Sequence, residues 1–440
     1  MSALAELEQL AGFSNASPPA VTRVAFSQED MRARAWVKQL CRDAGLAVRE
    51  DAVGNTFARW CGTESQAGAV GTGSHIDAIP DSGRYDGTMG VLGGLEAIRA
   101  LKRDGFIPRR SIELLMFTSE EPTRFGIGCL GSRLLSGSLD PSVADNLMDA
   151  EQRPLSSPKG ADARRQTAKE LVKPLGGPLN TVPVLGGFLK TVREAAGFRG
   201  SLADVRLPGD YYVAFVELHI EQGPILERSG IDLGIVTDIA APATLRVEIT
   251  GEGGHAGAVL MPERRDAFLG ASEIALAVEK AASSTGAPDT VATAGACRVF
   301  PNAVNSIPSR VTLEVDVRDI DSDRRDSVVR AILEAAKRVH DERRLRVETT
   351  IVNADAPAHC DERVVAALEQ AADRARLSRT RMISRAYHDS LFMSRIAPTG
   401  MLFIPCRGGV SHRPDEYSAP EHIANGVRAL TEALRLLASD

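Results

Sequence analysis

The stretch from Gly73 to Gly90, GSHIDAIPDSGRYDGTMG, carries one histidine and three aspartates. It follows a short apolar run, and the ends of strands are where an open α/β sheet presents its ligands. Imidazole and carboxylate bind zinc, manganese and iron, so His75, Asp77 and Asp86 could hold a divalent cation. The same residues would also suit a simple turn after a strand. The loop is therefore a candidate site that other parts of the chain must support.

A pair of glutamates follows the next expected strand. The apolar run Ile112 to Thr118 stops at Ser119 and is followed directly by Glu120 and Glu121. Apolar residues at helical spacing separate this run from the earlier strand over 69–73, which gives the order strand, helix, strand. Both strands of such a unit end at the same edge of a sheet. We therefore expect the two glutamates to lie near the histidine and aspartates of the first loop, although paired glutamates also occur at solvated strand ends.

Two further histidines occur in polar segments that follow apolar runs. His219 lies in ELHIEQG, where the expected strand over 211–216 ends, and His412 lies in GGVSHRPDEYS near the C-terminus. If these histidines join the first loop and the glutamates, the ligands are too many for one tetrahedral ion but suit two ions that share a carboxylate. Two such ions make hydroxide available at neutral pH. One glutamate could then bind metal while the other moves protons.

Composition limits the class of protein. The chain has 440 residues, 43% of them hydrophobic and 25% charged, which is typical of a globular protein with two domains. Its formal net charge of -6 comes from mixed signs without basic blocks, which argues against a nucleic-acid partner. No apolar run approaches the ~18 residues that a membrane span needs. Six scattered cysteines without CxxC pairs indicate neither a disulfide framework nor a thiolate zinc site.

The chain pattern changes character near Thr244. Alternating and helical periods then follow in the order βαββαβ, which is the ferredoxin-like order. We therefore predict an α/β fold in which a catalytic domain with a mixed sheet, residues 1–242 and 354–440, is interrupted by a ferredoxin-like α+β domain over 243–353. Residues 138–208 are rich in Gly, Pro, Ala and Ser, and we expect loops and short helices there without assigning them a role.

Seven ordered segments together resemble the amidase and carbamoylase branch of the dinuclear M20-type metallohydrolases. The similarity covers nearly the whole chain except about 140–208. It implies that the inserted domain is a dimerisation or lid domain and that the active site is shared between two subunits. The segments are GSHIDAIPDSGRYDG, FTSEEPTRFGIGCLGSRLLSG, ELHIEQGPILE, GGHAGAVLMPERRDA, PNAVNSIPS, VDVRDID and GGVSHRPDEYS.

The resemblance assigns roles to individual residues. It implies two Mn²⁺ per subunit, with Zn²⁺ as the other possibility, because His, Asp and Glu suit both ions. Asp86 would bridge the two cations, Glu120 would be the general base and acid, and Asp77 would orient His75. The implied metal ligands are His75, Asp86, Glu121, His219 and His412.

The remaining implied site residues contact the substrate. Three of them, His255, Asn305 and Arg318, fall in the inserted domain, where they would bind the scissile carbonyl and a substrate carboxylate, with His255 reaching across from the partner subunit. Without the resemblance these would be a turn residue, a loop cap and an edge-strand charge. The residues expected to line the pocket are Gln222, Tyr387 and His388.

The segments SRAYHDSLFMSR and HAGAVLMP look most like the plant-type members of the branch that act on ureidoglycolate. The implied activity is hydrolysis of the ureido group of (S)-ureidoglycolate, at the end of purine and allantoin catabolism, by a homodimer. Allantoate or an N-carbamoyl amino acid is the alternative substrate. A non-catalytic binding protein and an exopeptidase are disfavoured by Glu120 and by HIEQGP. We expect a cytoplasmic protein, or one of the endoplasmic reticulum if a leader has been removed as in plant relatives.

Overall fold

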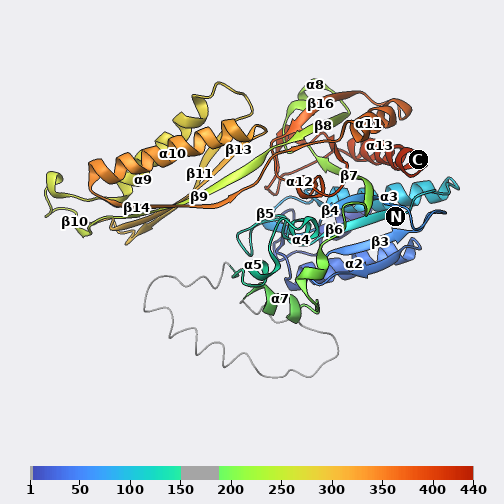
Figure 1. Cartoon of the computed structure of the whole chain (residues 1–440), viewed down its shortest axis with the longest axis horizontal. Helices are drawn as coiled ribbons and strands as arrows, with labels where there is room; N and C mark the ends of the chain where they lie inside the picture. Colours follow the sequence, from blue (N-terminus) through green and yellow to red (C-terminus); the bar gives the residue numbers. More distant parts are fainter. Residues whose placement is uncertain (1–2, 150–187, 440) are drawn as a thin grey trace. The chain divides into compact units, whose positions relative to one another are not determined.

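The computed structural model describes residues 3–149 and 188–439 (Figure 1). The described chain forms two compact units. The first unit runs to Thr237 and resumes over Cys360–Met382 and from His388 onwards. The second unit consists of Asp238–His359 and Ile383–Tyr387. The insertion expected over 243–353 therefore lies inside the second unit, which also takes up a short later segment.

A mixed sheet has nine strands, most of which lie in the first unit. Its strands are β2 (Ala47–Glu50), β3 (Thr56–Trp60), β4 (Ala69–His75), β6 (Ile112–Phe117), β7 (Tyr212–Ile220), β8 (Leu233–Ile239), β15 (Ala358–His359), β16 (Arg379–Ser384) and β17 (Thr399–Ile404). The order is β15-β8-β17-β7-β4-β6-β3-β2, with β16 also paired to β8. The adjacent strands β17, β7, β4 and β6 are parallel. Their carboxyl ends therefore meet at one edge of the sheet.

Helices pack on both faces of this sheet. They are α1 (Ala3–Ala11), α2 (Gln28–Asp43), α3 (Thr88–Arg103), α4 (Leu130–Ser136), α11 (Glu362–Arg374), α12 (Ser390–Met393) and α13 (Pro420–Ser439). Gly94 brings α3 close to the sheet, because a Cβ at this position would lie 2.8 Å from a methyl group of Leu114. Leu114 lies on β6, and the next residue of this strand, Leu115, points to the opposite face of the sheet. There Leu115 packs in an apolar cluster that includes Phe215 and Leu130. The central strands are thus buried on both sides.

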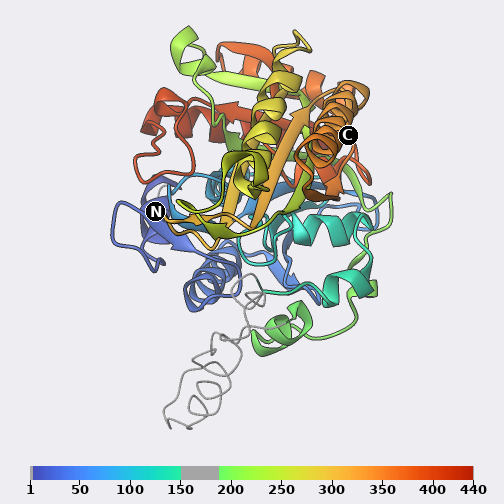
Figure 2. The same ribbon diagram turned by 90° about the vertical axis from the view of Figure 1, so that its left-hand side faces the viewer.

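The second unit is built on a four-stranded antiparallel sheet in the order β11-β13-β9-β14. Its elements are β9 (Ala241–Thr250), α9 (Ala267–Ser283), β11 (Val291–Phe300), β13 (Arg310–Asp319), α10 (Ser322–Arg343) and β14 (Arg346–Ala354). Figures 1 and 2 show α9 and α10 side by side on one face of this sheet. Alternate residues of β9, Leu245, Val247 and Ile249, point into the core beneath them. The predicted fold class, an α/β domain with a ferredoxin-like insertion, is confirmed.

Strand β7 is longer than the sequence pattern indicated. The prediction ended the strand at Val216, but it continues through Ile220. The reason is that the charged side chain in the extension has buried partners: Glu217 accepts hydrogen bonds from the hydroxyls of Ser74 and Ser390, each at 2.6 Å. A polar residue with such partners can remain inside a buried strand. His219 is therefore a strand residue.

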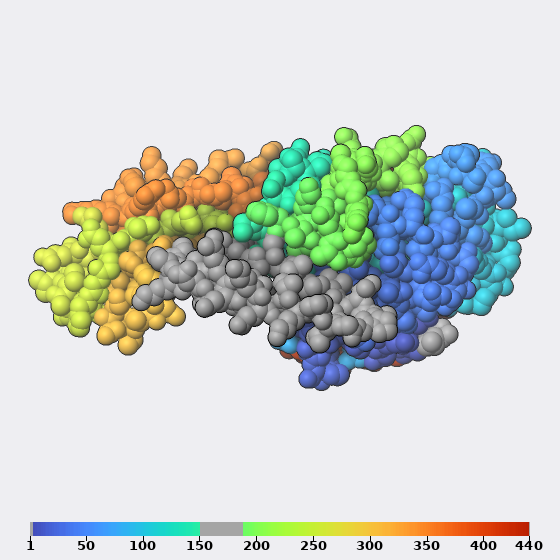
Figure 3. Space-filling view, turned by 90° about the horizontal axis from the view of Figure 1, so that it is seen from below, coloured from blue at the N-terminus to red at the C-terminus, as the bar shows by residue number. Residues whose placement is uncertain are grey.

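Short elements connect these layers. They are β1 (Val21–Arg23), β5 (Ala78–Ser82), α5 (Pro141–Asp145), α7 (Leu189–Ala195), η2 (Leu202–Val205), α8 (Ile225–Ser229), β10 (Gly254–His255), η3 (Met261–Glu263), β12 (Ser306–Ile307) and η4 (Arg407–Gly409). The short helices expected within 138–208 are present where that stretch is described, and residues 150–187 lie outside the described residues. Figure 3 shows the part containing α7 against the N-terminal part of the chain. Arg193 of α7 donates to the carbonyl of Ala52 at 3.1 Å. Across residues 3–149 and 188–439, no helix is long and apolar enough to cross a membrane.

Candidate metal centre

Three parallel strands deliver the central residues to one edge of the sheet. His75 is the last residue of β4, and His219 is the last but one residue of β7. Glu120 and Glu121 follow β6 by three and four residues. Asp86 comes from the loop that leads into α3. All five side chains belong to the first unit, and each is less than 10% exposed.

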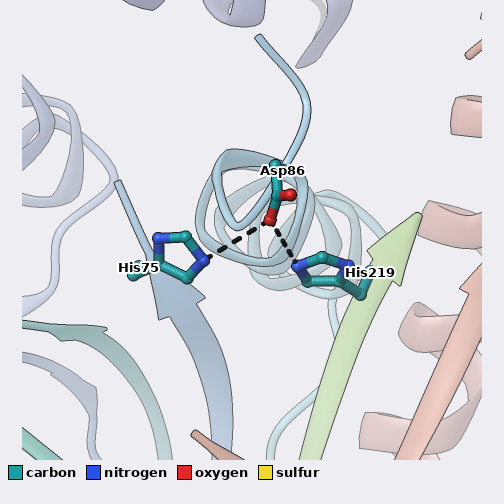
Figure 4. A group of neighbouring side chains, drawn as sticks. All are labelled: His75, Asp86 and His219. Carbon is teal, nitrogen blue, oxygen red and sulfur yellow. Dashed lines mark ion pairs between the residues drawn. The ribbon is translucent and has the colours of Figure 1, made fainter. Parts of the chain in front are cut away.

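The first group of potential ligands is His75, Asp86 and His219 (Figure 4). Oδ1 of Asp86 lies 3.6 Å from Nε2 of His75 and 3.2 Å from Nε2 of His219. The Nδ1 atoms face backbone carbonyls, that of Asp77 at 3.0 Å and that of Ile220 at 2.9 Å. If each Nδ1 donates to its carbonyl, each Nε2 keeps the lone pair that a metal-binding histidine requires. That of His219 accepts from the N–H of Gly87 at 3.0 Å.

The second group is Asp86, Glu121 and His412. Nε2 of His412 lies 3.3 Å from Oδ2 of Asp86 and 3.4 Å from Oε1 of Glu121. Asp86 thus belongs to both groups and offers a different oxygen to each. Buried imidazole and carboxylate donors that face one another in this way fit two divalent cations with a bridging carboxylate. The five residues fit the predicted ligand set in type and position.

The pKa values of the candidate ligands are consistent with the binding of cations. Burial alone would raise the pKa of Asp86, but hydrogen bonds from His219, His412 and His75 hold it well below its usual range. Burial and the neighbouring charge of Asp86 raise the pKa of Glu121 to about 7. Hydrogen bonding to Asp86 raises the pKa of His412 to about 9. A cation would replace the protons that Glu121 and His412 otherwise hold.

Asp77 supports the centre in two ways. Its backbone carbonyl faces Nδ1 of His75, while its carboxylate lies 3.8 Å from the same ring. The two carboxylate oxygens accept hydrogen bonds from the backbone N–H groups of Glu120 and Glu121, at 3.3 and 3.0 Å. The residue expected only to orient a histidine therefore also fixes the turn that carries both glutamates.

Two of the three predicted pocket residues lie beside the ligands. The side-chain amide of Gln222 donates to Oδ2 of Asp86 at 2.6 Å, and its backbone has a φ of 55°. The ring of His388 is buried, with its centroid 4.6 Å from that of His219. Glu217, His219 and His388 also form a third cluster of potential ligands. Gln222 thus contacts a predicted ligand directly, which its prediction as a pocket residue did not specify.

The other predicted site residues belong to the second unit. His255 on β10 is exposed and lies beside Asn305, because the N–H of Ala256 donates to the carbonyl of Asn305 at 3.0 Å. Arg318 on β13 is held by Asp316, with Nε 2.7 Å from Oδ1. The hydroxyl of Tyr387 donates to Oδ2 of Asp355 at 3.3 Å. Within this unit, His255 and Asn305 are neighbours.

Several residues that support the centre were missed by sequence reasoning. Ser411 donates to Oδ2 of Asp86 at 2.7 Å, and Glu416 accepts from the N–H of Tyr85 at 2.7 Å. Asp389 is fully buried and accepts a short hydrogen bond from Ser132. The available signal was proximity in sequence, because Ser411 and Glu416 flank His412 in the segment SHRPDEYS. Asp389 follows His388 directly.

This fold and this centre define a member of a metallohydrolase family. The chain matches Peptidase family M20/M25/M40 over residues 71–436 and belongs to that family. It is 50% identical to a ureidoglycolate hydrolase of Oryza sativa subsp. japonica over 98% of this chain and 83% of that protein. A ureidoglycolate hydrolase of Arabidopsis thaliana is 50% identical over 99% of this chain and 86% of that protein. A crystal structure of AtUAH in complex with (S)-hydroxyglycine superposes with a TM-score of 0.86 at 48% identity, covering 100% of this chain and 97% of that one.

Proposed function

We propose that the protein is a metal-dependent amidohydrolase that cleaves the ureido group of (S)-ureidoglycolate. The observation that carries this proposal is the 50% identity to two proteins of that activity over nearly the whole chain, combined with a complete set of candidate ligands. The ligand of the structurally similar AtUAH, (S)-hydroxyglycine, is also the species this route produces before glyoxylate.

The reaction follows from the chemistry of the ureido group. The oxygen of water attacks the ureido carbonyl carbon, and the bond to the terminal nitrogen breaks with release of ammonia. The carbamic acid that remains loses CO₂ to give (S)-hydroxyglycine. This compound then releases a second ammonia and leaves glyoxylate. One water is consumed, and two ammonia, one CO₂ and one glyoxylate are formed.

Two divalent cations, when bound, would supply Lewis acidity that activates water and polarises the carbonyl. His75 and His219 would hold one cation and Glu121 and His412 the other, with Asp86 shared. Mn²⁺ is our proposal for both positions, and Zn²⁺ is the alternative that the same donor types allow.

Glu120 would accept the proton of the attacking water and deliver it to the leaving nitrogen. Its Oε2 lies 3.6 Å from Nε2 of His75, so the carboxylate is beside the candidate ligands, yet it belongs to neither of the two ligand groups that share Asp86. A base in this place needs to reach the water without being occupied by a cation. The position of Glu120 supports that role.

Further residues would contact the substrate. Gln222 and His388 lie beside the ligands, and Tyr387 precedes His388 in the chain. Arg318 offers a planar pair of donors that suits the substrate carboxylate, and Lys could not reproduce this geometry. His255 and Asn305 would donate to the oxygen on which negative charge develops.

We further propose that two copies of the chain form a homodimer in which His255 serves the partner's site. His255 is exposed, and within the second unit it lies beside Asn305. Strand β11 lies at the edge of its sheet and exposes Val291 and Phe300. An exposed apolar edge strand is a natural pairing surface. These features support the second unit as the dimerisation domain.

An ammonia-release assay tests the function. The Mn²⁺-loaded protein is expected to release ammonia from (S)-ureidoglycolate with a higher kcat/KM than from allantoate or N-carbamoyl-β-alanine. The Glu120→Gln variant, prepared in the same way, controls for contaminating activity. A higher kcat/KM on allantoate or on the carbamoyl compound would move the protein to another activity, and no turnover of any of the three would refute the proposal.

A further inference from the structure

A buried thiol touches the proposed proton shuttle. Sγ of Cys129 lies 3.4 Å from Oε1 of Glu120, which is hydrogen-bonding distance for a thiol. Cys129 precedes α4 directly and is fully buried. Burial raises the pKa of this thiol well above its usual value, so the sulfur keeps its proton and remains a donor. The contact therefore places a neutral donor on one oxygen of the carboxylate.

The backbone around this contact is tightly fixed. The N–H of Cys129 donates to the carbonyl of Glu120 at 2.7 Å, and the N–H of Leu130 donates to that of Ser119 at 2.9 Å. Cys129 and Ser119 both have positive φ, 55° and 54°, which residues other than glycine seldom adopt. Backbone angles of this kind persist only where the surrounding structure fixes them. The thiol thus approaches the carboxylate from a rigid support.

Glycine at position 131 makes the close approach possible. A Cβ there would lie 2.0 Å from Oδ1 of Asn55 and 2.8 Å from the backbone nitrogen of Thr118. The N–H of Gly131 also donates to the carbonyl of Thr118 at 2.9 Å. The segment that carries Cys129 is therefore pressed against the segment that carries Glu120 over three consecutive residues.

We propose that Cys129 is a positioning residue for Glu120. Its thiol holds Oε1, so that Oε2, the oxygen nearer His75, stays directed toward the candidate metal centre. This inference rests on the proposed function, because it takes Glu120 as the proton shuttle. It adds a residue that acts through the orientation of one carboxylate.

Steady-state kinetics of Cys129 variants test whether the thiol positions Glu120. Cys129→Ala is expected to lower kcat roughly tenfold, a smaller loss than the ~10²-fold of a 1 Å misplacement, with KM and metal content unchanged. Cys129→Ser keeps a donor of similar size and should recover most of the lost rate. Cys41→Ala removes another buried thiol, on α2, and is the matched control, expected to keep wild-type kcat. A kcat of Cys129→Ala equal to that of the control would overturn the proposal.

A double-mutant cycle separates positioning from general stability. In the Glu120→Gln background, Cys129→Ala should cause no further loss of kcat, because the group that it orients is already disabled. The same fractional loss in both backgrounds would assign the effect of Cys129 to packing and reject its action on Glu120. Melting temperatures of all variants identify any that are poorly folded.

Raman spectroscopy tests the contact without turnover. The S–H stretching band of Cys129 is assigned from the difference between wild-type protein and Cys129→Ala. It should shift to higher frequency in Glu120→Ala, because the carboxylate acceptor is lost, and remain in place in Cys41→Ala. An unshifted band would refute the contact. This result is obtained even if no ureido compound is hydrolysed, so failure of the inference is distinguishable from failure of the proposed function.

Discussion

Glu416 accepts a hydrogen bond from the backbone N–H of Asp86, at 3.2 Å and across 330 positions of sequence. The same carboxylate oxygen also accepts from the N–H of Tyr85 at 2.7 Å, and the other oxygen receives the hydroxyl of Ser411 at 2.9 Å. Glu416 is only 3% exposed. It therefore joins the loop that carries Asp86 to the loop that carries His412, two residues that must meet for the second cation.

Replacement of Glu416 should loosen the second cation position. In Glu416→Ala the two loops lose their shared acceptor, and we expect the affinity for one of two Mn²⁺ to fall about 10- to 100-fold, as for other groups that orient ligands. Isothermal titration calorimetry measures both affinities. Glu421→Ala, an exposed glutamate on α13, is the control. Two unchanged affinities in Glu416→Ala would show that the loops are held by other contacts.

The expected ligands could be named from the sequence because they stand in ordered motifs at strand ends. His75, Glu120 and Glu121 were placed together by the rule that parallel strands end at one edge. The supporting contacts could not be predicted in this way. The bond between Glu416 and Asp86 depends on how two distant loops meet, and that between Cys129 and Glu120 depends on a positive φ at a residue other than glycine.

In the fold, too, the sequence pattern predicted some features and missed those that depend on tertiary contacts. Alternating apolar residues in β9 and β13 predicted the inserted sheet, because their period matches their burial. Periodicity failed in β7, where Glu217 interrupts the apolar pattern but is buried against Ser74 and Ser390. It also gave no sign that 383–387 joins the second unit, because that placement depends on tertiary contacts.

Loss of the shared ligand should remove both cations. Asp86 faces His75 and His219 with one oxygen and His412 with the other, so Asp86→Ala deletes a ligand from both groups. Elemental analysis after dialysis is expected to find less than one cation per chain. Asp81→Asn changes an exposed aspartate of the preceding strand β5 and should retain two. Full occupancy in Asp86→Ala would contradict the shared position.

The pH dependence of metal binding follows from His412. In the metal-free protein, hydrogen bonding to Asp86 raises the pKa of His412 to about 9, so the ring is protonated at neutral pH. A metal ligand must lose that proton, and binding should therefore release protons at pH 7.5 and become tighter as the pH rises toward 9. Calorimetry in buffers of different ionisation enthalpy counts the protons. Binding without proton release at pH 7.5 would mean that His412 is not a ligand.

Glu120→Gln should separate metal binding from turnover. The change keeps the size of the side chain and removes its ability to accept a proton, so kcat should fall by ~10²-fold or more. Metal content should remain that of the wild type, because Glu120 belongs to neither ligand group that shares Asp86. Steady-state kinetics and elemental analysis on one preparation give both values. A variant with near-normal kcat would exclude Glu120 as the proton shuttle.

Mixing two inactive variants tests the shared site. A donor aimed at the developing oxyanion is worth about 2.7–4 kcal/mol, so His255→Ala should lose most activity while its own metal centre stays intact. Glu120→Gln is inactive for a different reason. After subunit exchange between the two dimers, about a quarter of wild-type activity should return, because half of the dimers are mixed and each contains one intact site. Native mass spectrometry verifies that mixed dimers have formed. Mixed dimers without recovered activity would place His255 in the site of its own chain.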